Sequence, residues 1–179
     1  IINEYGREIN VANPIVESLI KLKPNHIVTT NFDNLIEFSL AHSNLVDTPI
    51  RGDLSRYVKI TKDVDFVNAK RNRFFIKMHG DTNNMEQLVL KEDDYLQYSR
   101  THSFIETFIK TLFINHSFLF VGYGIGDYNL KLIMSWVESI TCQSNQEIDR
   151  TQHFFINPEL KPINAHEKNY YQKRNINIL

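Results

Sequence analysis

The sequence is poor in the residues and patterns on which several common kinds of protein depend. It has one cysteine, Cys142, among 179 residues, which excludes an internal disulfide and a cysteine-based zinc site within this chain. No apolar run approaches the roughly 20 residues that cross a bilayer, and the longest, Phe118–Tyr123, has the length of a buried strand. The 20 Lys and Arg residues are balanced by 21 Asp and Glu residues without a run of either sign, so no footprint for nucleic acid is evident.

What the sequence does contain is typical of a folded domain. Hydrophobic residues make up 42% of the chain and phenylalanine alone contributes 12 residues, which is enough to build a core. We expect residues 1–179 to form a single domain of ordinary size. The low cysteine content fits a reducing compartment, and we expect a cytoplasmic protein without a membrane segment.

Short β-branched or apolar segments alternate with helical patterns along the chain. We expect strands at residues 27–30, 74–78, 118–122 and 153–156, and helices at residues 14–22, 34–42, 103–115 and 127–136. Strands that are apolar throughout are typical of a parallel sheet covered on both faces. The sequence therefore predicts an α/β fold, Rossmann-like, with helices on both faces and with residues 27–30, 74–78 and 118–122 in one central sheet.

Polar and glycine residues follow three of the predicted strands. They are Asn31 and Asp33 after the first, His79 and Asp81 after the second, and the turn from Gly122 to Asp127 after the third. In parallel sheets, ligands bind beyond the carboxyl ends of the strands. We therefore expect Asn31, His79 and Gly122 to converge on one crevice.

Each of these groups also has a purely structural interpretation. Asn31 and Asp33 are ordinary helix caps, and for them the two interpretations are equally favoured. His79 fits a general base because the unperturbed pKa of imidazole is about 6.5, although a lone histidine is more often structural. Tyr95 and Tyr98 are candidates to line the pocket.

The glycine-rich turn Gly122–Asp127 is a weak signal by itself. It could place backbone N–H groups against a phosphate, or it could be a tight turn with no ligand. Its glycine spacing differs from the G-x-G-x-x-G of dinucleotide-binding folds, and no Walker sequence, G-x-S-x-G or H-E-x-x-H occurs in the chain.

Taken together, three blocks resemble the sirtuin-like family, in particular its prokaryotic NAD-hydrolysing branch. The blocks are Thr29-Thr30-Asn31-Phe32-Asp33-Asn34-Leu35, Met78-His79-Gly80-Asp81 and Phe120-Val121-Gly122-Tyr123-Gly124-Ile125-Gly126-Asp127-Tyr128-Asn129. Residues 88–95 are similar to a further signature of the family. The resemblance covers approximately residues 15–137, and the order and spacing of the blocks make it fairly specific.

The resemblance implies roles for individual residues. Asn31 resembles the asparagine that orients the nicotinamide ribose or the attacking water, Asp33 the carboxylate near the nicotinamide carboxamide, and His79 the catalytic histidine. Gly122 and Tyr123 stand where related proteins have a turn that contacts NAD+. Thr30 and Asp127, from the same blocks, complete the expected contacts with NAD+.

Two departures from the family pattern shape the expected activity. Deacetylating sirtuins carry a four-cysteine zinc module that this chain cannot build, so we expect no metal site and we disfavour protein deacetylation. The family's N-terminal Gly-Ala-Gly-x-Ser turn, which cradles the pyrophosphate, is expected upstream of Ile1. We therefore expect the chain to be a fragment of a longer protein, inactive if made alone.

The resemblance implies an NAD+ glycohydrolase that releases nicotinamide and ADP-ribose in bacterial antiviral defence by NAD+ depletion. Cyclisation of the ADP-ribose product stays open. The alternatives are a module that senses NAD+ or ADP-ribose without catalysis, an NAD-dependent protein deacylase, and an oligomerisation domain with a decayed pocket. NAD+ is the expected substrate, and the resemblance leaves room for a homo-oligomer, through this or adjacent domains, and for a phage-derived activator.

Overall fold

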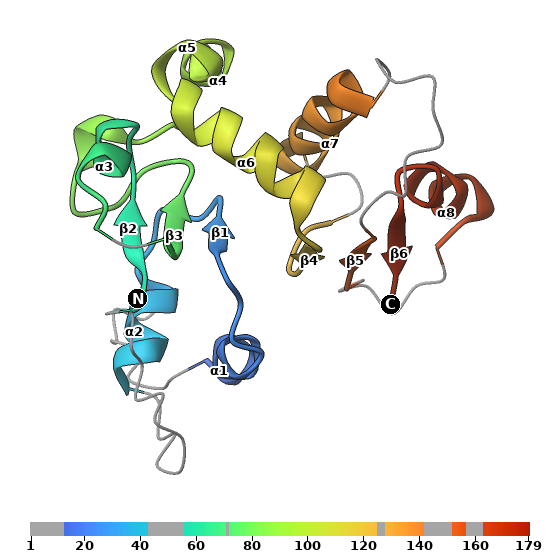
Figure 1. The fold of residues 1–179 in the computed structure, drawn as a ribbon, viewed down its shortest axis with the longest axis horizontal. Coiled ribbons are helices and arrows are strands. Elements are labelled where there is room, and N and C mark those ends of the chain that lie inside the picture. The colour runs from blue at the N-terminus through green and yellow to red at the C-terminus, as the bar shows by residue number, and fades with distance from the viewer. Residues whose placement is uncertain (1–12, 43–55, 71, 125–127, 142–151, 157–162) are drawn as a thin grey trace, which may run out of the picture. The chain divides into compact units, whose positions relative to one another are not determined.

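The structure is a computed structural model that describes residues 13–42, 56–70, 72–124, 128–141, 152–156 and 163–179. The chain divides between Ile105 and Glu106 into two compact units. Each unit contains a parallel sheet (Figure 1).

The first unit is built on a sheet of three parallel strands. They are β1 (Ile27–Thr29), β3 (Phe74–Lys77) and β2 (Val58–Ile60), and β3 lies between the other two. Thr29 is opposite Lys77 in the register of β1 and β3, and Ile60 is opposite Ile76 in that of β2 and β3. The carboxyl ends of all three strands therefore meet at one edge.

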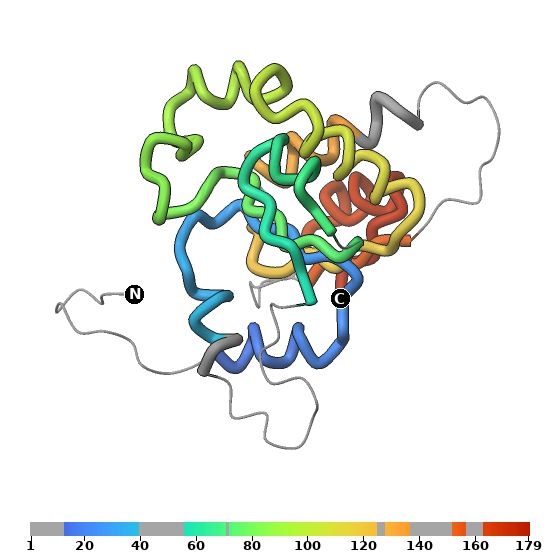
Figure 2. Tube along the Cα trace, turned by 60° about the vertical axis from the view of Figure 1, so that its left-hand side comes forward, coloured from blue at the N-terminus to red at the C-terminus, as the bar shows by residue number. Residues whose placement is uncertain are grey.

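The first two helices of this unit, α1 (Pro14–Lys21) and α2 (Leu35–His42), flank β1 in the sequence and pack against each other (Figure 2). Asn13 caps α1 by accepting hydrogen bonds from the N–H groups of Ile15 and Val16, and proline occupies the first turn, as the sequence predicts. A small apolar cluster joins these elements; it consists of the buried Ile20 with Val16, Ile27 and Ile36.

The further described helices of this unit are α3 (Val64–Val67), α4 (Glu92–Leu96) and α5 (Tyr98–Thr101), with a 3-10 turn at Met85–Gln87. The next helix, α6 (Ser103–Asn115), begins at the end of the first unit and continues into the second. Asp63, just before α3, caps α6 by accepting hydrogen bonds from the N–H groups of Phe104 and Ile105 at 3.0 and 3.1 Å. Those partners stand some 40 residues from Asp63 in the sequence, so local patterning could not identify this cap.

The second unit contains the other parallel sheet, in the order β4 (Leu119–Phe120), β5 (His153–Phe155) and β6 (Ile176–Ile178). Phe120 is opposite Phe155, and Phe155 is opposite Ile178. Its further helices are α7 (Tyr128–Thr141) and α8 (Ala165–Gln172). Asn164 and Glu167 form a capping box at the start of α8.

The α/β class and the parallel pairing of the strands are confirmed. The described strands form two three-stranded sheets, one in each unit, and residues 118–122 contribute β4 to the second. That residues 27–30, 74–78 and 118–122 share one sheet stays a prediction. The described part of β4 is two residues long, and its carbonyl groups bond to β5, where Phe118 and Phe120 accept from Phe154 and Ile156 at 2.7 and 2.9 Å. A single domain over residues 1–179 stays a prediction.

A buried histidine holds the start of β4. The Nδ1 atom of His153 accepts a hydrogen bond from the N–H group of Phe118 at 3.2 Å, and its ring packs edge-on against Phe113 with centroids 5.0 Å apart. Burial lowers the pKa of His153 to about 4, so its imidazole is neutral at pH 7.

We predict that stability is lost between pH 6.5 and pH 4. The folded-state pKa of His153 lies below the unfolded value near 6.5, so its contribution is complete above pH 6.5 and disappears as the pH falls through about 4. That loss is at most about 3 kcal/mol. Urea unfolding at several pH values measures this loss. Between pH 6.5 and pH 4 the free energy of unfolding should fall less in His153→Asn than in the wild type, because asparagine keeps an acceptor for the N–H group of Phe118 but does not titrate. If the free energy of unfolding fell equally with pH in the wild type and in His153→Asn, the loss of stability could not be assigned to His153.

Candidate functional site

The carboxyl ends of β1 and β3 are joined by backbone hydrogen bonds. The N–H group of Met78 donates to the carbonyl oxygen of Thr29 at 2.9 Å, and that of Thr82 donates to the carbonyl oxygen of Phe32 at 3.0 Å. The turn that follows β1 and the turn that follows β3 therefore form one continuous surface. Asn31 lies on the first turn and His79 on the second.

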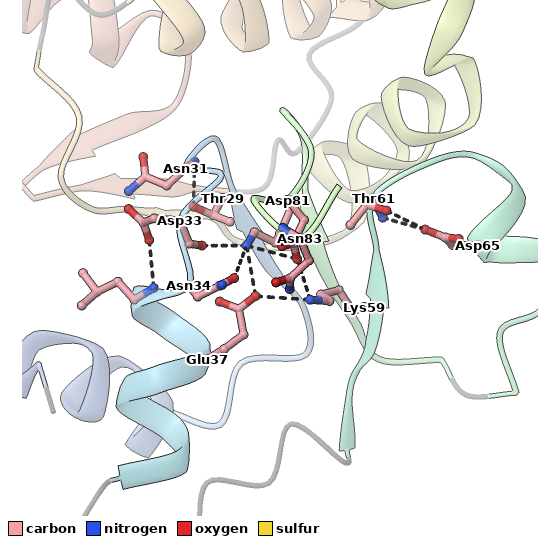
Figure 3. Close-up of polar contacts among 12 residues, drawn as sticks. Thr29, Asn31, Asp33, Asn34, Glu37, Lys59, Thr61, Asp65, Asp81 and Asn83 are labelled. Atoms are coloured by element: carbon pink, nitrogen blue, oxygen red, sulfur yellow. Dashed lines mark hydrogen bonds and ion pairs between the residues drawn. The ribbon is translucent and has the colours of Figure 1, made fainter. Parts of the chain in front are cut away.

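On the first turn, the two predicted site residues have different environments. Asn31 is exposed, and its N–H group donates to Oγ1 of Thr29 at 3.1 Å. Figure 3 shows the Asn31 amide directed away from the charged side chains of Glu37 and Asp81. Oδ1 of Asp33 accepts from the N–H group of Leu35 at 2.9 Å, so this carboxylate does serve the start of α2. Thr30, which precedes Asn31, is half-buried.

On the second turn, His79 is almost fully enclosed, with 5% of its surface exposed. Its ring lies edge-on to the ring of Tyr95 with centroids 5.2 Å apart, and to that of Tyr98 at 6.3 Å. Tyr98 is itself stacked on His102 at 4.6 Å. The tyrosines of α4 and α5 thus pack edge-on against the imidazole, and their role in lining a pocket stays a prediction.

Gly80, next to His79, is required by the geometry of the second turn. Its φ is +85°, in the region that favours glycine, and a Cβ added there would lie 2.6 Å from the carbonyl oxygen of Gln87. The carbonyl oxygen of His79 accepts from the N–H group of Val89 at 3.1 Å. The His-Gly pair therefore lets the chain from Gln87 to Val89 approach His79 closely.

A charged cluster lies behind both turns (Figure 3). At its centre is Lys77, which is 0% exposed. Its Nζ atom lies 2.6 Å from the carbonyl oxygen of Asp33, 3.3 Å from Oδ1 of Asn34, 3.1 Å from Oε1 of Glu37 and 3.3 Å from Oδ2 of Asp81. Lys59 contacts the same carboxylates, at 2.5 Å from Asp81 and 3.6 Å from Glu37.

Two members of this cluster, Asp81 and Lys59, are stabilised in their charged forms. Burial by itself would raise the pKa of Asp81, but the hydrogen bond from Lys59 and the nearby Lys77 hold it below its usual range. Burial would lower the pKa of Lys59, but Asp81 and Glu37 raise it above the usual range. This cluster was not predicted from the sequence. The one signal for it was a lysine within the otherwise apolar segment Phe74–Met78.

The remaining predicted site residues belong to the second unit. Gly122 has a φ of +80°, and an added Cβ would meet no described atom within 4 Å. Tyr123 is half-buried, with its ring edge-on to Phe120 at 6.3 Å. Asp127 lies outside the described residues. The convergence of Gly122 with Asn31 and His79 stays a prediction.

A further surface feature of the first unit lies away from the carboxyl ends of β1 and β3. A shallow basic depression is lined by Arg56, Ala69, Lys70, Asn72 and Arg73, at the amino ends of β2 and β3, opposite the end that carries His79. Within the ranges that the structure describes, no three His, Cys, Asp or Glu side chains are grouped to hold a metal ion. Among the described helices, none combines the length and the apolar character needed to cross a bilayer.

Comparison with known proteins shows the family of this chain. Residues 25–179 match the SIR2-like domain. The chain belongs to the SIR2-like domain family. It is 31% identical over 182 residues to defense-associated sirtuin 2 of Bacillus subtilis, an alignment that covers 100% of this chain and 17% of that protein.

Further relatives carry the name of an enzyme. This SIR2-like domain is 31% identical to the NAD(+) hydrolase ThsA of Bacillus cereus (strain MSX-D12), over 87% of this chain and 30% of that protein. It is 30% identical to the protein of the same name from Cytobacillus dafuensis, over 81% of this chain and 26% of that protein. The chain thus spans less than a third of the length of these relatives.

We predict that alanine is tolerated very differently at two glycines of this SIR2-like domain. Gly80→Ala combines a positive φ with a clash against Gln87, and should lower the free energy of unfolding by at least about 2 kcal/mol. Gly122→Ala, with a similar φ and open space, should cost only about 1 kcal/mol. Urea unfolding of both variants measures the difference. Equal losses would mean that the close approach of Gln87 to Gly80 does not constrain the fold.

Proposed function

We propose that this SIR2-like domain provides most of the active site of an NAD+ glycohydrolase, and that the protein containing it acts in antiviral defence by depleting NAD+. Two relatives are named NAD(+) hydrolase and another is named a defense-associated sirtuin, which supports both parts of the proposal. The observation that carries it is structural: backbone hydrogen bonds join the turn that bears Asn31 to the turn that bears His79.

The proposed reaction breaks the bond between C1′ of the ribose and the nicotinamide nitrogen. Nicotinamide leaves as a neutral molecule with the bonding electron pair, and positive charge develops on the ribose. The oxygen of a water molecule forms the new bond at C1′, and His79 accepts the proton that this water loses. The products are nicotinamide and ADP-ribose, and no metal is required.

Asn31 and His79 contribute to this reaction in different ways. The exposed Asn31 amide holds the water or a ribose hydroxyl in line, and such positioning can lower a barrier by several kcal/mol. The Tyr95 and Tyr98 rings around His79 fix the orientation of the imidazole and limit the access of bulk water. Asp33 lies near the carboxamide of nicotinamide, while Thr30, Gly122, Tyr123 and Asp127 contact the rest of NAD+. A pyrophosphate-binding turn from outside this chain completes the site.

We predict that Asn31→Ala and His79→Gln lower the turnover of NAD+ in the full-length protein by about 10²-fold or more, since each removes a group that acts on the reacting atoms. Nicotinamide release is the measurement. Asn31 is exposed, so Asn31→Ala should leave the melting temperature unchanged. For the enclosed His79, glutamine preserves more of the packing against Tyr95 than alanine would.

The matched control is Asn25→Ala, another exposed asparagine, which precedes β1 at the opposite end of the strand. It should leave nicotinamide release unchanged. Turnover that is unaffected by Asn31→Ala would contradict the assigned role of Asn31. A full-length protein that binds NAD+ without releasing nicotinamide would favour the sensing module instead.

We predict that two substitutions of Asp33 separate its capping role from its role in the reaction. Asp33→Asn keeps an oxygen that accepts from the N–H group of Leu35, so its melting temperature should stay near that of the wild type while nicotinamide release falls. Asp33→Ala should lose nicotinamide release and also about 1 kcal/mol of stability, the usual cost of a lost cap. Full activity in Asp33→Asn would show that Asp33 is a cap and nothing more.

A further inference from the structure

The charged cluster contains a residue whose contacts reach both turns of the candidate site. Lys77 lies on β3, two residues before His79, and its side chain is fully buried. One of its acceptors is a backbone atom, the carbonyl oxygen of Asp33 at 2.6 Å, which belongs to the turn that bears Asn31. Lys77 also forms an ion pair with Oδ2 of Asp81 at 3.3 Å, on the turn that bears His79.

We infer that Lys77 is a positioning residue, whose buried ammonium group sets the relative placement of the Asn31 and His79 turns for the reaction. This inference rests on the proposed function, because the placement matters for turnover only if both turns act on one substrate. A side chain that held a single element would not fit these contacts, because Lys77 bonds at once to the backbone of the first turn, to Glu37 on α2 and to Asp81.

Burial makes this placement rigid. An ammonium group removed from water must keep its hydrogen-bond acceptors and its ion pairs, so Asp33, Glu37 and Asp81 cannot move apart without exposing an unsatisfied charge. Lys59 bonds to the same two carboxylates but is 40% exposed, and the structure shows no bond from it to the first turn within the described residues. Lys59 therefore balances the charge of the cluster, while Lys77 determines its geometry.

The test uses the full-length protein. It distinguishes the placement of the two turns by Lys77 from the contribution of Lys77 to the charge balance of the cluster. Lys77→Met alone leaves two carboxylates facing Lys59, and should lower both stability and nicotinamide release. The combined variant Lys77→Met with Glu37→Gln removes one charge of each sign, and Asp81 keeps its bond to Lys59. We expect its melting temperature to return close to that of Glu37→Gln, while kcat stays at least about tenfold lower and KM changes little.

The matched control is Lys59→Met, which removes an exposed cation from the same carboxylates and should change kcat by less than about twofold. A combined variant that recovers kcat together with its melting temperature would overturn the inference, because Lys77 would then serve charge balance alone. A combined variant that does not fold would also overturn it, since the role would then be structural.

Amide hydrogen exchange provides a measurement that does not depend on activity. The N–H groups of Met78 and Thr82, which join the two turns, should exchange faster in the combined variant than in Glu37→Gln. If the wild-type protein releases no nicotinamide, the proposed function fails, and this measurement alone decides the inference. Unchanged exchange at both positions would then overturn it.

Discussion

A buried ammonium group is the constraint on which the first unit depends. Lys77 interrupts an apolar strand, and a charge in that position is tolerated only because four oxygens surround it. Two of those oxygens belong to carboxylates, and Lys59 supplies a second cation to the same pair. The cluster thus combines two positive and two negative side chains and balances its own charge. Its geometry requires β1, α2 and β3 to meet at one end, so the fold of this unit and the shape of its candidate site have the same cause.

Parallel pairing explains why that end of the sheet can carry chemistry. Beyond Thr29 and Lys77 the strands no longer pair, and the turns satisfy each other's backbone groups through the bonds of Met78 and Thr82. Such a junction holds its side chains precisely without burying all of them. Asn31 is exposed while His79 is enclosed by Tyr95. One residue can therefore meet a substrate directly, and the other is kept in a fixed orientation.

Much of this could be predicted from the sequence, because the signals were local. The Asn13-Pro14 cap, the helix over Ser103–Asn115 and the strand at Phe74–Lys77 all depend on neighbours in the chain. Long-range features were missed. Asp63 caps a helix some 40 residues away, and the acceptors of Lys77 lie on the turn after β1 and on α2. The order of the strands within each described sheet also had no local signal, since apolar segments predict strands but do not determine which of them pair.

Histidines lie at both ends of the parallel strands, and we assign a stabilising role to those at the amino ends and a chemical role to the one at a carboxyl end. At the amino ends, Nδ1 of His26 accepts from the N–H group of Phe74 at 3.3 Å, and Nδ1 of His153 accepts from that of Phe118 at 3.2 Å. Each ring also packs against a phenylalanine, so the same device starts a strand in both units. An imidazole used in this way must stay neutral to accept a hydrogen bond, which removes it from proton transfer. His79 follows the carboxyl end of β3 instead, where the turns after β1 and β3 meet. Its position, more than its residue type, distinguishes it as the candidate base.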